Sequence, residues 1–239
     1  MGAGVLMLRE GFEASLIVGI VLAFLNKTDR RDGFAAVWLG TFVAIAISVG
    51  VAIGLFAVGA KLEGTAEYVF EGTAMLLAAG LLTWMIFWMR RQARSIKKDL
   101  ESQVQTALAA GSSFALATVA FVGVLREGVE TSLFFFSSVE GSKGATSIVG
   151  SIVGLALAVA LGYLFYKGSS RLDLRRFFTI TSDILLLFAG WLLARGIEEY
   201  AEAGILPENA LILWGAFVAL AAPTLYLFFR PARTKPATT

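Results

Sequence analysis

Two copies of a short charged motif lie inside long apolar segments and have the residue types needed to bind a cation. The motif reads Arg-Glu-Gly-x-Glu and occurs at residues 9–13 and 126–130. Residues three and four apart share one face of an α-helix, so the arginine and both glutamates of each copy are predicted to lie on one face. The central glycine falls on the far side, where it permits close approach of a second helix.

Each copy combines one arginine with two glutamates, which leaves a formal charge of −1. A charged side chain at the centre of a bilayer costs at least about 2.5 kcal/mol on insertion scales, so ionisable residues there are expected to be functional. Carboxylates that are incompletely neutralised at low dielectric favour a bound cation or protons. A purely structural ion pair is the alternative, and the duplication of the motif argues against it.

The composition indicates an integral membrane protein and restricts the metal ligands that it can offer. Of the 239 residues, 57% are hydrophobic and 16% are charged, whereas soluble domains carry about 25% charged residues. The chain has no cysteine and no histidine, which excludes disulfides and thiolate or imidazole metal sites. Oxygen ligands favour hard cations such as Mg²⁺, Ca²⁺, Mn²⁺ and Fe³⁺. Met7 and Met75 could add sulfur, although methionine in a membrane usually serves packing.

Seven apolar segments are long enough to cross a hydrocarbon layer about 30 Å thick as helices. They are at about residues 2–25, 34–58, 68–89, 113–138, 146–166, 177–197 and 210–229. The one long connection, at residues 90–111, is expected to contain an amphipathic helix. The first segment has no basic leader or cleavage site before it, so we expect it to be retained. The sequence predicts an all-α membrane protein with a single transmembrane domain, residues 1–239.

The basic residues predict the orientation of these spans. Most lysines and arginines lie in the connections after the first, third, fifth and seventh spans. By the positive-inside rule, the N-terminus is then outside and the C-terminus cytoplasmic. The same basic excess accounts for the net positive charge, so no nucleic-acid partner is expected.

The order of features predicts a 3+3 inverted repeat followed by one extra helix. The first repeat is at about residues 1–91, the second at about 113–200, and the extra helix at about 210–229. Each repeat begins with a motif helix and continues with a glycine-rich helix. Its third helix has an acid near the start, Glu71 or Asp183. Three spans per repeat give the halves opposite topology, which is typical of transporters with a central site. Estimated depths allow the two motifs to face each other.

Paired Arg-Glu-Gly-x-Glu motifs in the first and fourth spans of a seven-helix chain resemble the iron permease family. This family includes the fungal high-affinity iron permease and the bacterial oxidase-dependent iron transporters, and the resemblance covers essentially the whole chain. It implies inward transport of Fe³⁺, usually just after a partner has oxidised Fe²⁺. The iron ligands that it implies are Glu10, Glu13, Glu127 and Glu130. Arg9 and Arg126 are implied as charge balance.

Further acidic residues are assigned with less specific evidence. The resemblance implies an acidic outer loop before the last helix, which corresponds to Glu198, Glu199 and Glu202. These could collect cations at an outer entrance or form a solvated loop end. Glu71 and Asp183 could belong to the pathway or to a second site, with a structural hydrogen bond near a helix start as the alternative.

The resemblance also sets expectations for partners and location. Iron is the transported substrate, no prosthetic group is expected, and the chain is predicted not to be an enzyme. Membrane lipid surrounds it, and an iron oxidase or iron-delivery protein outside the cytoplasm would be a separate chain. The expected location is a prokaryotic cytoplasmic (inner) membrane.

Several other functions stay open at this stage. The protein could carry another cation, such as lead or manganese, or it could be a proton-coupled carrier. Glu10 or Glu127 could then bind protons, because burial disfavours the charged form of a carboxylate. A membrane oxidoreductase with a carboxylate metal site is less favoured, because helical di-iron sites usually add histidine and haem needs histidine or cysteine. No phosphate-cradling ATPase motif is present.

Overall fold

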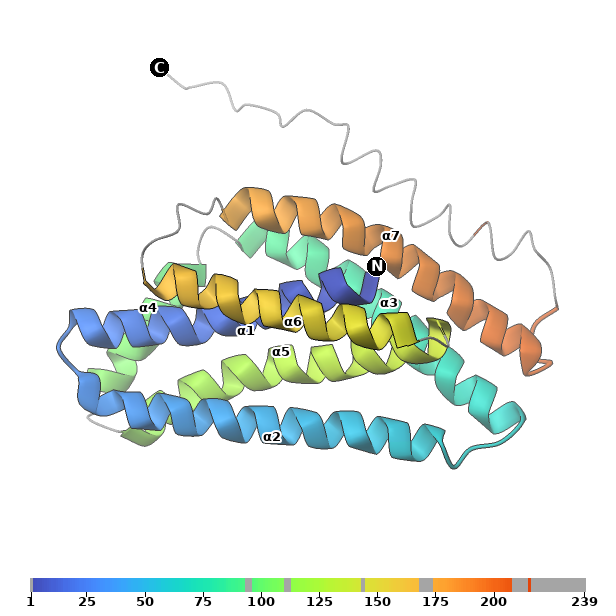
Figure 1. Cartoon of the computed structure of the whole chain (residues 1–239), viewed down its shortest axis with the longest axis horizontal. Coiled ribbons are helices and arrows are strands. Elements are labelled where there is room, and N and C mark those ends of the chain that lie inside the picture. Colours follow the sequence, from blue (N-terminus) through green and yellow to red (C-terminus); the bar gives the residue numbers. More distant parts are fainter. Residues whose placement is uncertain are drawn as a thin grey trace, which may run out of the picture.

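The computed structural model describes residues 2–92, 96–109, 113–142, 145–167, 174–207 and 215, and all of its secondary structure is helical (Figure 1). The helices are α1 (Gly2–Lys27), the short 3-10 turn η1 (Arg31–Gly33), α2 (Phe34–Gly59), α3 (Thr65–Gln92), α4 (Ile96–Ala109), α5 (Ser113–Ser142), α6 (Ala145–Tyr166) and α7 (Leu174–Glu202). Six of the seven predicted spans correspond to long helices. The predicted extra helix at 210–229 lies outside the described residues, except for residue 215.

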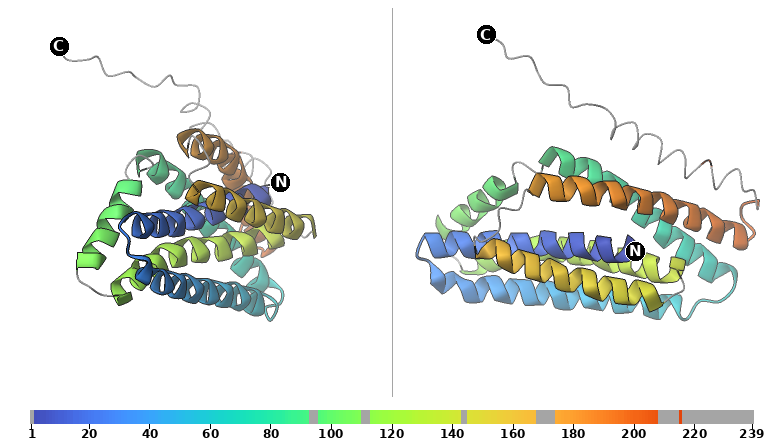
Figure 2. Two further views of the ribbon diagram at one scale, coloured as in Figure 1. Left: turned by 60° about the vertical axis from the view of Figure 1, so that its left-hand side comes forward. Right: turned by 45° about the horizontal axis from the view of Figure 1, so that its top comes forward.

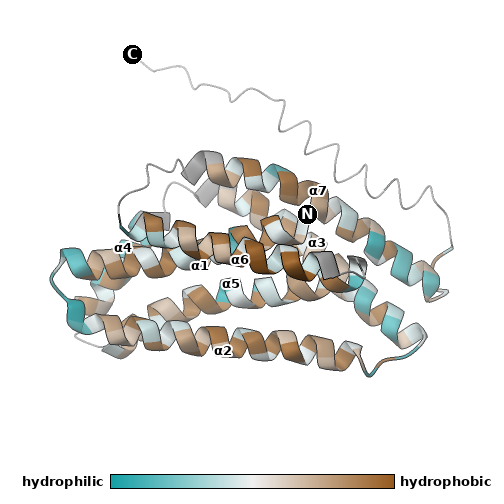
Figure 3. Ribbon diagram, viewed as in Figure 1, coloured by the Kyte–Doolittle hydropathy of each residue, from teal (hydrophilic) through white to brown (hydrophobic). Residues whose placement is uncertain are grey.

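Length and composition alone mark four of these helices as able to cross a membrane. They cover Arg31–Gly59, Thr65–Met89, Ser147–Leu164 and Phe177–Glu202. The two motif helices, α1 and α5, are long enough as well, but each carries three charges within five residues. Figure 3 shows hydrophobic residues along α2 and α6 and hydrophilic residues gathered at helix ends. Both features agree with an integral membrane protein.

The helices pack in pairs that are exchanged between the two halves of the chain. α1 packs along α6, α2 along α5 and α3 along α7, while α1 also crosses α5 (Figure 2). The first helix of each half therefore lies against the second helix of the other half. The short helix α4 lies in the connection that was predicted to contain an amphipathic helix, and it contacts α1 and α5.

Glycines at the exchanged contacts let the helix backbones approach closely. A Cβ atom placed on Gly154 of α6 would overlap the carbonyl oxygen of Gly4 and come within 3.1 Å of the Leu8 nitrogen in α1. In the other pair, a Cβ atom on Gly40 of α2 would overlap the carbonyl oxygen of Ala117 in α5. Small residues at helix interfaces are the usual means of tight packing in membranes. These contacts fix α1 and α5, which carry the motifs.

The last described helix extends further than the sequence analysis predicted. The three acids assigned to an outer loop lie in the final two turns of α7, so the loop assignment was wrong. Residues 197–203 contain no glycine or proline, and the helix ends at Gly204, whose φ is +73°. The amide of Gly204 donates to the carbonyl of Ala201, and the amide of Ile205 donates to that of Tyr200, which completes a glycine C-cap.

Candidate metal-binding site

Three carboxylates from the two motifs meet where α1 crosses α5. One oxygen from each of Glu10, Glu127 and Glu130 lies within 4.8 Å of the others, and all three residues are buried. The prediction that the motifs face each other is therefore borne out by the geometry. Residues 117 positions apart in the sequence become neighbours because α1 and α5 are held against each other through α2 and α6.

Within each motif, the arginine forms an ion pair with the second glutamate. Arg9 Nε lies 3.0 Å from Glu13 Oε1, and Arg126 Nε lies 3.1 Å from Glu130 Oε1. Both pairs join residues four apart on one helix, as the spacing predicted. In the second motif, Arg126 Nε is also 3.8 Å from Glu127 Oε1.

Glu13 and Glu130 are the second glutamates of the two motifs, and they differ in whether they belong to this group of three carboxylates. Glu130 belongs to the group and is also paired with Arg126, whereas Glu13 is paired with Arg9 and lies outside the group. The structure thus brings together three of the four implied iron ligands. Nothing in the geometry tests whether any of them binds a metal, so that role stays a prediction.

Several oxygens of the group are buried without a donor. Neither carboxylate oxygen of Glu10 accepts a hydrogen bond from an arginine, a hydroxyl group or a backbone amide in the described part of the chain. Oε2 of Glu127 and Oε2 of Glu130 are likewise without a hydrogen-bond partner there. A buried carboxylate that lacks a donor is costly as an anion. A bound cation or a proton would satisfy these oxygens.

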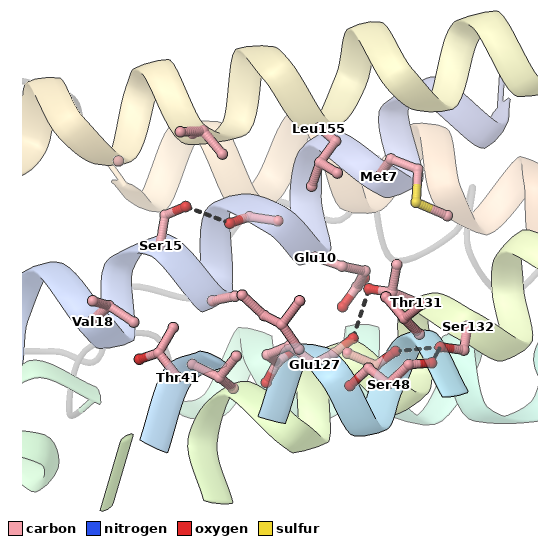
Figure 4. A pocket seen from close by; sticks show the side chains of 18 of the residues that line it. Met7, Glu10, Ser15, Val18, Thr41, Ser48, Glu127, Thr131, Ser132 and Leu155 are labelled. Atoms are coloured by element: carbon pink, nitrogen blue, oxygen red, sulfur yellow. Dashed lines mark hydrogen bonds between the residues drawn. The ribbon is translucent and has the colours of Figure 1, made fainter. Parts of the chain in front are cut away.

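A large, mostly apolar cavity of about 1240 Å³ reaches the carboxylate group between α1, α2, α5 and α6. Glu10 and Glu127 are the acids on its lining (Figure 4), whereas Glu130 is not part of the lining. Its other polar lining residues are mainly hydroxyl-bearing and are Ser15, Thr41, Ser48, Thr131, Ser132, Ser151, Tyr163 and Tyr166. Two of the three carboxylates, those of Glu10 and Glu127, therefore border this cavity.

The central glycine of each motif lies on the packed side of its helix, as predicted. A Cβ atom on Gly11 would lie 2.9 Å from the Cβ of Ala158 in α6. A Cβ atom on Gly128 would lie 2.7 Å from the Cβ of Ser48 in α2. The hydroxyl of Ser132 donates across the same contact to the backbone carbonyl of Ser48, at 2.8 Å. Each glycine therefore sets how closely its motif helix meets its partner helix.

The two arginines have different surroundings. The Arg9 side chain is 0% exposed, and its Nη1 and Nη2 atoms have no hydrogen-bond partner among the described residues. The Arg126 side chain is 36% exposed, and its guanidinium carbon lies 4.6 Å from the centroid of the Trp88 ring in α3. Sequence reasoning missed Trp88, because nothing in the linear pattern connects a tryptophan near the end of one span to an arginine in the next.

The remaining predicted acids lie apart from the carboxylate group. Glu71 is buried on α3 and Asp183 is half-buried on α7, and neither is one of the three grouped carboxylates. On α7, Arg195 forms an ion pair with Glu198, and its Nη2 is 3.6 Å from Glu199, which is 1% exposed. Glu202 is exposed. Of the other two acids assigned to an entrance, Glu198 is partly exposed and Glu199 is buried.

Long apolar helices around a buried acidic group define this chain as an integral membrane protein. A family model described as the Iron permease FTR1 family matches residues 1–215, and the chain belongs to this family. It is 37% identical over 202 residues to the ferrous iron permease EfeU of Escherichia coli O157:H7 and to that of Shigella sonnei, with 84% of this chain and 73% of each relative covered. The EfeU of Yersinia pestis is 34% identical, with 84% and 72% covered. No solved structure matches this chain.

Family membership decides the coarse function. The protein is an iron-transport permease of the membrane, in agreement with the resemblance stated from the motifs. The relatives are named as permeases and not as enzymes, which agrees with the predicted class.

Proposed function

We propose that this protein carries Fe³⁺ inward across the membrane and that Glu10, Glu127 and Glu130 hold the ion on its way. The observation that carries this proposal is the group of three buried carboxylates within 4.8 Å, several of whose oxygens have no donor in the described part of the chain. Oxygen ligands suit a hard ion such as Fe³⁺. Glu13 would serve as a fourth acid next to the group, with Arg9 and Arg126 limiting the negative charge.

Fe²⁺ is the second candidate, and two observations favour it. The four motif glutamates and two arginines sum to a formal charge of −2, which a divalent ion neutralises. The relatives in Escherichia coli and Yersinia pestis are named ferrous iron permeases. Lead and manganese are further divalent candidates, and a proton-coupled mechanism would use the same carboxylates.

For the transport cycle, we propose two inverted repeats that move relative to each other around the carboxylate group, with the N-terminus outside and the C-terminus cytoplasmic. The exchanged packing of α1 with α6 and α5 with α2 is what a two-fold relation between the halves would produce, and it supports this proposal. We place the protein in a prokaryotic inner membrane, with residues 210–229 as a seventh span.

Iron would reach the protein from the side of the membrane that faces away from the cytoplasm. We propose a separate iron oxidase or iron-delivery protein as the partner, and Glu202 as the exposed acid of an outer entrance that also includes Glu198 and Glu199. Glu71 and Asp183 are proposed as pathway acids on α3 and α7. These roles rest on the resemblance and on position alone.

The experiment that tests the proposed function is iron uptake by vesicles that contain the purified protein. Chelated Fe³⁺ and reductant-held Fe²⁺ are compared for the wild type, Glu10→Gln and Glu127→Gln, with Glu63→Gln, an exposed acid in the α2–α3 connection to which no transport role is assigned, as the control. We expect uptake of Fe³⁺ that both buried variants lose and the control keeps. Uptake of Fe²⁺ alone would select the second candidate. Normal uptake in both buried variants would reduce the motifs to structural ion pairs, and competition by Mn²⁺ or Pb²⁺ would measure selectivity.

A further inference from the structure

Trp88 of α3 lies over the guanidinium group of Arg126 in the second motif. The guanidinium carbon is 4.6 Å from the centroid of the ring. The face of a tryptophan ring attracts a cation at this distance, and the attraction grows as the cation loses its water and its other partners. Among the described residues, no aromatic ring is recorded over Arg9, so this contact distinguishes the two motifs.

Arg126 also contacts two of the three grouped carboxylates. Its Nε lies 3.1 Å from Glu130 and 3.8 Å from Glu127, and its Nη2 has no hydrogen-bond partner in the described part of the chain. A cation that enters the group must approach these same oxygens. Because like charges repel strongly at low dielectric, the incoming ion and the guanidinium group compete for the two glutamates.

Arg126 has room to give way, whereas Arg9 does not. The Arg126 side chain is 36% exposed and that of Arg9 is 0% exposed. Neither Arg126 nor Trp88 lines the large cavity that reaches the group from between α2 and α6. The contact between Arg126 and Trp88 therefore lies outside the lining of this cavity.

We propose that Trp88 is a positioning residue for transport, which holds Arg126 when iron takes its place at Glu127 and Glu130. Without iron, the guanidinium group is shared between the carboxylates and the ring. With iron bound, it loses the carboxylates and keeps the ring, so its attraction to Trp88 is larger in this loaded state. Trp88 therefore lowers the iron concentration at which the site fills. This inference rests on the proposed iron site.

The test compares the iron dependence of uptake in vesicles for the wild type, Trp88→Leu, Trp88→Phe and Trp84→Leu. We expect Trp88→Leu to raise the apparent KM by about twofold to thirtyfold, the range that cation–π attraction spans, with the maximal rate unchanged. Phenylalanine is comparable to leucine in bulk but keeps an aromatic face for the guanidinium group. The KM of Trp88→Phe should therefore lie between those of the wild type and Trp88→Leu. A role in packing alone would not separate leucine from phenylalanine in this way.

Trp84 provides the matched control on the same helix. It lies one turn before Trp88, is 56% exposed and stacks on Trp88 with ring centroids 6.3 Å apart, without a recorded contact to Arg126. Trp84→Leu should leave KM unchanged. Iron binding to the folded fraction of each variant in detergent repeats the comparison without requiring transport.

The possible results separate the inference from the proposed function. A wild type that neither binds nor takes up iron would overturn the proposed function itself. A wild type with saturable uptake, together with an unchanged or lowered KM in Trp88→Leu, would overturn only the role of Trp88. An equal increase in KM for Trp88→Leu and Trp88→Phe would also overturn the role of Trp88. So would an increase in KM for Trp84→Leu.

Discussion

Arg9 and Arg126 occupy the same position in the two motifs, and each pairs with the glutamate four residues later. Arg9 is completely enclosed, with two of its nitrogens unpartnered among the described residues, whereas Arg126 is partly exposed and lies against Trp88. The pair within each helix follows from the five-residue motif alone. The surroundings of each arginine are provided by other helices. Two copies of one motif can therefore differ, with an enclosed, fixed arginine in one copy and a partly exposed, adjustable arginine in the other.

The largest difference that we expect concerns stability. Arg9→Met should lower the free energy of unfolding by about 3–5 kcal/mol, because Glu13 would be left as an unpaired buried charge. Arg126→Met should cost at most about 2 kcal/mol, since its side chain is partly exposed and the contacts that it leaves behind are less buried. Denaturant unfolding of both variants in detergent, followed by helix content, measures the difference. Equal losses would contradict the contrast between a fixed and an adjustable arginine.

The second glutamates of the motifs should differ in iron binding. Glu130→Gln removes a member of the carboxylate group and should weaken binding by at least about 100-fold, whereas Glu13→Gln removes the partner of Arg9 and should cost about tenfold. Titration of the purified variants with iron gives both dissociation constants. If Glu13→Gln were the more damaging change, the ion would lie closer to the first motif than the grouped oxygens indicate.

The central glycines should both resist substitution, but their defects should be relieved to different extents. Gly11→Ala and Gly128→Ala should each destabilise by about 1–3 kcal/mol through overpacking. The new methyl group at Gly128 meets only Ser48, so adding Ser48→Gly should restore stability. At Gly11 it meets Leu155 as well as Ala158, so relief by Ala158→Gly should be partial.

Thermal unfolding of the two double variants beside their single variants tests this contrast between the glycines. Full relief in both pairs would show that Leu155 moves aside easily. No relief in either pair would show that the helices cannot shift at these contacts.

The smallest effect should separate two serines at matching motif positions. Ser15 donates within its own helix, to the carbonyl of Gly11, whereas the single hydroxyl hydrogen of Ser132 is within reach of two carbonyls, that of Gly128 in its own helix and that of Ser48 in α2. Ser132→Ala should therefore cost about 0.6 kcal/mol, the average for a hydrogen bond between membrane helices, and Ser15→Ala close to nothing. Chemical unfolding of the two variants is the measurement, and a larger loss for Ser15→Ala would reverse the assignment.

Features set within one helix could be predicted from the sequence. The spacing of Arg9 and Glu13 is enough for their ion pair, and the apolar lengths are enough for the long helices found at six of the predicted spans. The iron permease family could also be predicted, because the duplicated Arg-Glu-Gly-x-Glu motif is specific to few proteins. The loop assignment of Glu198 and Glu199 failed because helix ends depend on the capping residue, here Gly204, and not on the acids themselves.

Features set between helices could not be predicted in the same way. That Glu130 joins the carboxylate group and Glu13 does not depends on how α1 and α5 cross, and both have the same position in the motif. Trp88 shares no pattern with Arg126 in the sequence. Its role depends on α3 packing against α5, which is a contact between separate spans.

The exchanged packing also has a consequence for biosynthesis. α1 leaves the ribosome first and carries the three charges of its motif, yet its partners α5 and α6 follow more than a hundred residues later. At about 5–20 residues per second, the helix waits on the order of ten seconds before its charges can be enclosed. During that time the insertion machinery or the membrane interface must shelter it. A chain truncated before α5 would therefore be a substrate for quality control and not a stable half-transporter.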